Sequence, residues 1–267
     1  MWDDLQTKYC FKGILELRTA LHIGGGNVNT GYTDSPVVRT PDGTPFIPGS
    51  SLKGVLRSTV EKLAVSLPGI KTCQLFDTDT KCPTPDEKTF NTWKTGKPED
   101  QIVARLRKDL CATCKLFGSP YSHSKLTVHD LALQEWAEVT QVRDGVVIDR
   151  DSERARDKLK YDYEVVPPGA TFALEIWLEH PVDADLALAC VAMNELRSGT
   201  VHIGGNTSRG LGSCQLHHLE MYELNLKGDD RDARLKHYLL GKTLQDKMVN
   251  ISDVDTFLEE NILPLVS

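Results

Sequence analysis

The chain has 267 residues, of which 40% are hydrophobic and 26% charged, and its formal net charge is −7. These values are typical of a globular protein with one large domain, and the acidic balance argues against nucleic-acid binding by overall charge, though not against a local basic groove. No apolar run is long enough to span a bilayer, and the acidic N-terminus lacks a signal-peptide hydrophobic region. We therefore expect a cytoplasmic protein without membrane contacts.

The first strand is predicted over residues 11–21 and leads into a run of glycines. The glycines are Gly24, Gly25 and Gly26. Glycine reaches positive φ and lets another backbone approach closely, so this loop can present its amides to a ligand. A polar loop with one carboxylate, Asp34, follows, then an extended run over 35–39 and a turn at 41–43. An isolated aspartate in such a loop is usually solvated or caps a turn.

Apolar residues at helical spacing predict a helix from Ser51 to Leu67, which Pro68 and Gly69 end. We expect Ser50 or Ser51 to cap its first amides, which would make the helix start a site for a phosphate. Basic residues gather near this helix start, and Lys53 and Arg57 share one helix face. They are Arg39, Lys53 and Arg57. The alternative is a solvated basic face without a ligand.

Residues 69–120 are predicted to form an insertion, because 71–97 is polar and lacks periodicity, with one short helix at 101–110. Four cysteines lie in this insertion and offer enough thiolates for a closed, structural zinc site. They are Cys73, Cys82, Cys111 and Cys114. The first pair is more widely spaced than usual, so His123 or His129 could replace Cys73 or Cys82, and four metal-free cysteines are the other alternative.

The rest of the chain predicts a strand at 126–135, a projecting hairpin at 139–166 and a strand at 171–178. The hairpin has arms at 139–148 and 161–166 and a charged tip at 149–160. The remaining elements are a helix at 186–196, strands at 201–203 and 213–224, and helices at 231–240 and 254–262 in a C-terminal extension, 227–267. This order predicts an α+β protein with a ferredoxin-like core.

A second glycine-rich segment at 202–212 repeats the pattern of residues 22–27. Its candidate phosphate contacts are backbone amides and one guanidinium, which together can hold a single phosphate. They come from Gly204, Gly205, Ser208, Arg209 and Gly210. The alternative is that Ser208 and Arg209 pair with nearby acids.

Several motifs occur in one order: HIGGG at 22–26, DSPV at 34–37, IPGSSLKG at 47–54, VPPG at 166–169 and SRGLG at 208–212. In this order they resemble the RAMP superfamily of CRISPR-associated proteins, and most closely the repeated backbone subunit of type III CRISPR effector complexes. The resemblance implies one domain over 1–267 with a modified RNA-recognition fold, a lid at 69–120 and a thumb at 139–166. It also implies a guide RNA, a complementary target RNA and neighbouring subunits as partners.

The resemblance further places Asp34 where these subunits keep an RNA-cleaving aspartate. It implies an endoribonuclease that uses Mg²⁺ or another divalent cation, in which a ribose 2′-hydroxyl attacks the adjacent phosphate and Asp34 holds the metal or positions the hydroxyl. We expect this activity only in the assembled complex. One alternative is a non-catalytic structural subunit of the same complex. Another is a standalone guide-processing nuclease with His22 as acid and base.

Overall fold

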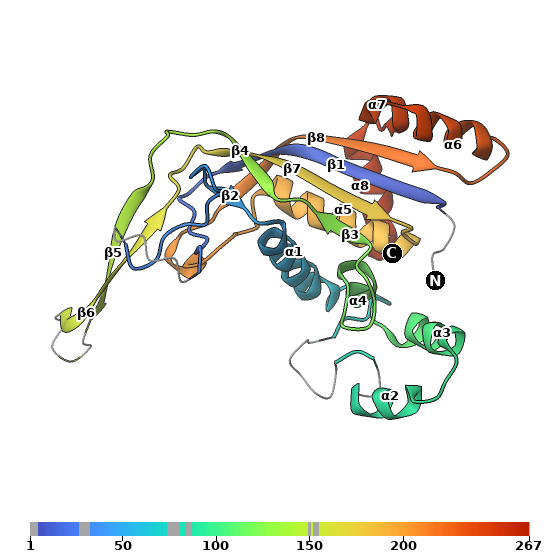
Figure 1. Ribbon diagram of the computed structural model, residues 1–267, viewed down its shortest axis with the longest axis horizontal. Coiled ribbons are helices and arrows are strands. Elements are labelled where there is room, and N and C mark those ends of the chain that lie inside the picture. Colours follow the sequence, from blue (N-terminus) through green and yellow to red (C-terminus); the bar gives the residue numbers. More distant parts are fainter. Residues whose placement is uncertain are drawn as a thin grey trace.

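The computed structural model describes residues 5–26, 33–73, 81–83, 87–148, 151 and 155–266. Its centre is a seven-stranded antiparallel sheet in the order β2-β4-β7-β1-β8-β9, with β3 also paired to β7 (Figure 1). The strands are β1 (Thr7–Leu17), β2 (Phe46–Ile47), β3 (Leu126–Val128), β4 (Leu131–Glu135), β7 (Thr171–Glu179), β8 (Cys214–Asn225) and β9 (Val249–Asn250). This mixture of helices and an antiparallel sheet agrees with the α+β class predicted from the sequence.

Both faces of this sheet carry apolar side chains, because alternate residues of a strand point to opposite sides. Phe11 and Leu15 of β1 face the main core, whereas Cys10 faces a smaller second core. The main core is covered by α1 (Gly49–Ala64) and α5 (Asp183–Ser198), with α8 (Val254–Ile262) packed on α5. The second core is covered by α6 (Arg231–Leu240) and α7 (Leu244–Lys247), which lie on the opposite side (Figure 1).

A β-bulge interrupts the pairing of β1 with β8, where the register shifts between Lys12 and Ile14. His218 takes a φ of 50° at this point, and Gly13 lies opposite. A Cβ on Gly13 would lie 2.7 Å from Leu216 Cδ1, so a side chain here requires a local shift. The extra residue reverses the alternation, so that Leu216 before the bulge and Met221 after it both reach the main core.

The predicted hairpin forms a separate two-stranded antiparallel sheet of β5 (Gln141–Ile148) and β6 (Ala155–Val165), which extends away from the main sheet (Figure 1). Part of the segment expected as a charged tip is strand, since β6 begins at Ala155. The remaining tip residues at 149–150 and 152–154 lie outside the described residues. Across the pair, the Tyr161 ring covers Gly145, where an added Cβ would lie 2.3 Å from the ring.

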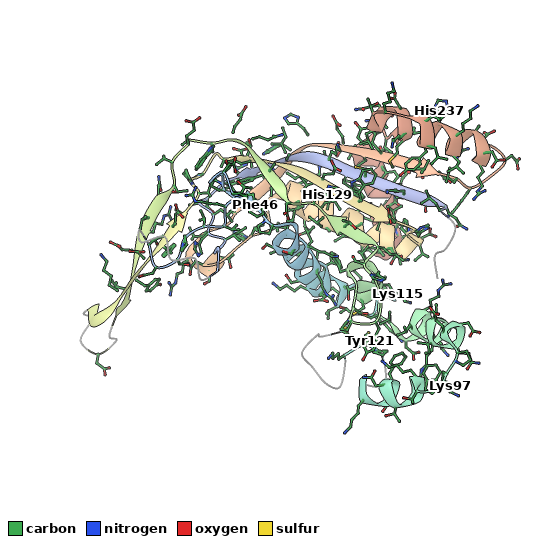
Figure 2. The ribbon with its side chains drawn as sticks, viewed as in Figure 1. Phe46, Lys97, Lys115, Tyr121, His129 and His237 are labelled. Carbon is green, nitrogen blue, oxygen red and sulfur yellow. The ribbon has the colours of Figure 1, made fainter. Side chains whose placement is uncertain are left out.

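The segment expected as an insertion is more regular than predicted, with α2 (Glu87–Lys94), α3 (Glu99–Asp109) and α4 (Ala112–Phe117). Residues 71–97, whose sequence shows no sustained periodicity, thus include a helix, α2. Phe90 of α2 is buried and meets Tyr121 edge-on at 5.1 Å between ring centres. Tyr121, labelled in Figure 2, also donates to Asn91 at 3.2 Å. A small number of aromatic contacts thus stabilise α2. Its sequence is mostly polar, so the buried side of the helix is not evident from the sequence.

Two further expectations are corrected. The single strand predicted at 126–135 is divided at His129 and Asp130, and Asp130 instead accepts a hydrogen bond from the Gly49 amide at 2.7 Å. The strand predicted at 201–203 is reduced to one bridge between His202 and Ser213.

The helices predicted at 231–240 and 254–262 are confirmed. None of the helices in the described segments has the length and hydropathy needed to cross a membrane.

Candidate RNA-binding face and metal centre

The two glycine-rich segments meet. The Gly205 amide donates to the His22 carbonyl at 2.8 Å, and the Gly212 amide donates to the Ala20 carbonyl at 2.9 Å. Gly204 has a φ of +82°, and an added Cβ would lie 2.3 Å from the His22 oxygen. Only glycine permits this approach of two backbones without displacement.

Most of the predicted phosphate contacts are exposed on this junction. The exposed residues are Gly24, Gly26, Gly204, Gly205, Ser208, Arg209 and Gly210. The first glycine segment is fixed on its other side, because the Gly25 amide donates to the Pro36 carbonyl at 3.0 Å. The polar loop expected at 27–32 lies outside the described residues.

Asp34 lies beside the base of the hairpin. Its amide donates to Asp162 Oδ1 at 2.7 Å, and the Asp162 amide donates to Asp34 Oδ2 at 3.1 Å. The next backbone contact is from the Glu164 amide to the Ser35 carbonyl at 2.9 Å. The pKa of Asp162 is lowered because its carboxylate accepts from the Thr33 hydroxyl and from the Asp34 amide. The loop with Asp34 is therefore attached to β6, while the Asp34 side chain is exposed.

His22 is 9% exposed and lies between these elements. Its Nδ1 is 2.6 Å from the Glu164 carbonyl, its Nε2 is 3.3 Å from Ser35 Oγ, and its ring meets Tyr163 edge-on. A carbonyl can only accept, so Nδ1 carries the hydrogen and Nε2 is left to accept from Ser35. Both ring nitrogens of His22 therefore face protein atoms, and the side chain is packed between the first glycine segment and the hairpin base.

Arg39 pairs with Glu164 at the same junction. Arg39 Nη2 lies 2.6 Å from Glu164 Oε1, and the other carboxylate oxygen accepts from the Val37 amide at 2.9 Å. Burial raises the pKa of Glu164, but hydrogen bonds from Thr140, Val37 and Arg39 outweigh it, so the pKa is lowered overall. Arg39 thus fixes the hairpin base, and its guanidinium already faces a carboxylate.

Arg209 connects the second glycine segment to the hairpin. Its Nη1 donates to the Tyr161 hydroxyl, and the Tyr161 ring stacks on Tyr163 with 6.2 Å between centres. Because Tyr163 also meets His22, a continuous row of side chains runs from the second glycine segment to the first. The predicted alternative of an acidic partner for Arg209 does not hold within the described residues, where the partner is a phenol.

The predicted serine caps of α1 are wrong. The N-cap residue is Pro48, and no side chain from the helix caps it. The Asp130 carboxylate accepts from the Gly49 amide instead, so the protein supplies its own anion at this helix start. Lys53 has no hydrogen-bond or ion-pair partner in the described part of the chain, and its pKa is lowered by burial and by the nearby Arg57 charge. Lys53 therefore remains available to an anion.

The four predicted cysteines come together. Their sulfur atoms all lie within 4.8 Å of one another, and Cys73 Sγ is 3.4 Å from Cys114 Sγ. A tetrahedral zinc with bonds of about 2.3 Å requires sulfur separations of about 3.8 Å, so the arrangement fits a structural zinc site. His123 and His129 do not belong to this group, so the alternative in which one of them replaces Cys73 or Cys82 is wrong. The His129 ring instead lies 3.4 Å from Glu175.

Backbone amides point at two of these sulfurs. The Cys111 amide donates to Cys82 Sγ at 3.2 Å, and the Cys114 amide donates to Cys111 Sγ at 3.4 Å from the first turn of α4. Hydrogen bonds from Cys114, Cys73 and Cys82 lower the pKa of Cys111, and the contact with Cys111 raises the pKa of Cys82 and of Cys114 in turn. No other group of three or more potential metal ligands occurs in the described residues, so none surrounds Asp34.

The profile of the RAMP superfamily matches residues 14–215, which include both glycine-rich segments, α1 and the hairpin. The chain belongs to the RAMP superfamily. This confirms the resemblance stated from the motifs. The family match ends before most of β8 and leaves the C-terminal helices of this RAMP protein outside it.

Similar proteins carry the name "CRISPR system Cms endoribonuclease Csm3". One from Methanothermobacter thermautotrophicus is 24% identical over 284 residues, which cover 95% of this chain and 99% of that protein. One from Methanocaldococcus jannaschii is 47% identical over 60 residues, 22% of this chain and 24% of that protein. One from Enterococcus italicus is 44% identical over 70 residues, 25% and 33% of the two chains. The last two alignments thus span a third or less of the relatives they match.

Sequence reasoning missed several residues that shape the site of this RAMP protein. Asp130 caps α1, while Asp162 and Glu164 hold the loop with Asp34 and the Arg39 side chain. Asp162 and Glu164 alternate with Tyr161 and Tyr163 along β6, and that alternation of acids and tyrosines was the available signal.

Proposed function

We propose that this RAMP protein is a backbone subunit of a type III CRISPR effector complex, which binds guide RNA and cleaves the complementary target RNA. The names of the relatives support the type of complex and the endoribonuclease activity. The observation that carries the proposal is the junction of the two glycine-rich segments beside an exposed Asp34.

The guide would lie along this junction. The exposed glycine backbones can approach a sugar–phosphate chain closely. Side chains near them can donate hydrogen bonds to the phosphates, which holds the RNA without recognising its base sequence. These side chains belong to Ser50, Ser51, Lys53, Ser208 and Arg209. A strand order of β4-β7-β1-β8, with α1 and α5 on one face, supports a ferredoxin-like core beneath it. The β5–β6 hairpin would serve as the thumb and the insertion with α2 and α3 as the lid.

The target would meet Asp34 at the hairpin base. Asp34 Oδ2 accepts from Asp162, whereas Oδ1 makes no hydrogen bond to the described residues and can serve the RNA. The 2′-hydroxyl would attack the adjacent phosphorus and lose its proton to a base. The bond to the 5′-oxygen would break, and that oxygen would take up a proton from water. The products would be a cyclic phosphate and a 5′-hydroxyl. Mg²⁺ or another divalent ion would stabilise charge on the phosphate, with further ligands supplied by the RNA or water.

The four cysteines would hold a structural zinc. Cys73, Cys82, Cys111 and Cys114 leave no open coordination position, so the ion would not take part in cleavage. Its effect would be to join the chain before α2 to the chain after α3.

The test is cleavage by the complex reconstituted with guide RNA. We expect Asp34→Ala to abolish metal-dependent cleavage while target binding is unchanged. Asp42→Ala, which alters an exposed acid in the nearby turn, is the matched control and should cleave normally. Cleavage that persists in the Asp34 variant would support the non-catalytic structural subunit. Cleavage of precursor guide by the isolated protein in EDTA, lost in His22→Ala, would support the standalone nuclease.

A further inference from the structure

The guanidinium of Arg57 faces the cysteine cluster. Its Nη2 lies 3.3 Å from Cys114 Sγ, its Nη1 donates to the Gly118 carbonyl at 2.8 Å, and its Nε donates to Glu61 at 2.8 Å. The side chain is only 14% exposed. All three nitrogens therefore have acceptors, which come from α1, from α4 and from the turn that follows α4.

We infer that Arg57 belongs to the metal site and not to an RNA contact, and that it couples the bound metal to helix α1. This inference rests on the zinc site proposed above. It changes the role expected for the basic face of α1. Lys53 has no partner among the described residues and can contact RNA, whereas the Arg57 guanidinium is already engaged.

The charge of the site favours such a partner. Four thiolates around one divalent zinc leave a net charge of −2, which is costly to bury without compensation. A guanidinium that donates to one sulfur offsets part of that charge and makes a strong, charge-assisted hydrogen bond. Groups that hydrogen-bond to metal ligands typically change metal affinity 10- to 100-fold.

The remaining contacts of Arg57 fix its direction. Gly118 has a φ of +92°, and an added Cβ there would lie 3.1 Å from the Ser124 amide, so the turn that aims its carbonyl is tightly packed. Glu61 holds the other edge of the guanidinium from the next turn of α1. Arg57 thus bridges a long helix of the main core and the short helix α4, which contains Cys114 and follows Cys111.

The experiment measures zinc in the full chain. Wild type, Arg57→Gln, Arg57→Lys and the control Glu61→Gln are purified with zinc, and zinc content is measured by mass spectrometry. Zinc release to a chelator is then timed. Each protein is also loaded with Co²⁺, because the sulfur-to-cobalt absorption band reports the charge around the thiolates. Glu61→Gln removes the neighbouring ion pair but leaves the contact with sulfur.

We expect one zinc per wild-type chain, release about tenfold faster in Arg57→Gln, an intermediate rate in Arg57→Lys and a rate within twofold of wild type in Glu61→Gln. The cobalt band should shift in Arg57→Gln and not in Glu61→Gln. Equal release rates and bands in Arg57→Gln and wild type would overturn the inference while the zinc site stands. Wild-type protein without zinc would instead overturn the metal site itself.

Hydrogen exchange tests the coupling separately. In wild type, removal of zinc lets the Cys114 thiolate take up a proton and become a weaker acceptor for Arg57. Amide exchange in the second half of α1 should therefore rise. In Arg57→Gln, exchange in α1 should be the same with and without zinc. A wild-type α1 that is insensitive to zinc would refute the coupling.

Discussion

Asp34 and Asp162 each accept a hydrogen bond from the backbone amide of the other, at 3.1 and 2.7 Å. This reciprocal pair attaches the loop with the proposed cleavage residue to strand β6 of the hairpin. A movement of the hairpin base would therefore move Asp34 as well. The position of the proposed catalytic group depends on a strand that lies far along the chain.

Asp162 is predicted to position Asp34. Asp162→Ala removes the acceptor for the Asp34 amide, so the loop should loosen and target cleavage by the assembled complex should fall about tenfold. Asp162→Asn keeps an acceptor oxygen and should retain most of the rate. Single-turnover cleavage with saturating target separates this effect from binding.

Equal rates in Asp162→Ala and Asp162→Asn, both near wild type, would contradict a positioning role. Equal and complete loss in both would show that the charge of Asp162, and not its hydrogen bond, is what cleavage needs.

Gly204 is predicted to be essential for the junction of the two glycine-rich segments. Gly204→Ala places a methyl group 2.3 Å from the His22 carbonyl at a φ of +82°, so we expect a loss of about 3 kcal/mol of stability. Gly210→Ala is the matched control, because its φ is +88° but nothing lies within 4 Å of an added Cβ. It should cost about 1 kcal/mol from backbone strain alone.

Urea unfolding gives both free energies, and guide-RNA affinity should fall in Gly204→Ala at temperatures where the variant stays folded. If the two alanine variants unfold at the same urea concentration, the contact between the segments is not what fixes this loop.

Glu164 is predicted to make stability depend on acid. Its pKa is lowered in the folded protein, so its stabilising effect is complete above its usual value of 4.5 and is lost as the pH falls through the lower folded value. Glu164→Gln should reduce the fall in unfolding free energy between about pH 5 and about pH 3. Arg39→Met removes one cause of the lowered pKa and should act in the same direction.

The test is the free energy of unfolding of wild type, Glu164→Gln and Arg39→Met, measured at several pH values across that range. Acid loss of zinc would affect all three proteins equally, so the difference from wild type is the relevant quantity. A Glu164→Gln profile parallel to that of wild type would show that the Arg39 pair does not set the acid response.

Lys53 is predicted to contact an RNA phosphate. Lys53→Ala should weaken guide-RNA binding and reduce the slope of log affinity against log salt by about 0.7, the value for one phosphate contact on a single strand. Lys62→Ala is the control, because Lys62 is an exposed cation on the last turn of the same helix. The affinity of each variant for a fluorescent guide RNA is measured at several salt concentrations. An unchanged slope in Lys53→Ala would exclude the phosphate contact.

Local patterns identified much of this protein from the sequence. Apolar spacing predicted α1, because the buried face of a helix repeats every three to four residues, and the sequence also predicted helices at the positions of α5, α6 and α8. The paired glycine motifs and the four cysteines were visible because their chemistry depends on residue type and spacing. The sequence also predicted the paired arms of the hairpin, although it extended the tip to residue 160, whereas β6 begins at Ala155.

Tertiary structure alone decided how these parts meet. Ser50 and Ser51 satisfy the local rule for a helix cap, but Asp130 from another segment takes that position. Arg57 shares a helix face with Lys53 and yet turns to a cysteine, and Asp34 finds its partner on β6. A hydrogen bond or ion pair between segments depends on distances that folding sets, and residue spacing along the chain carries no information about them.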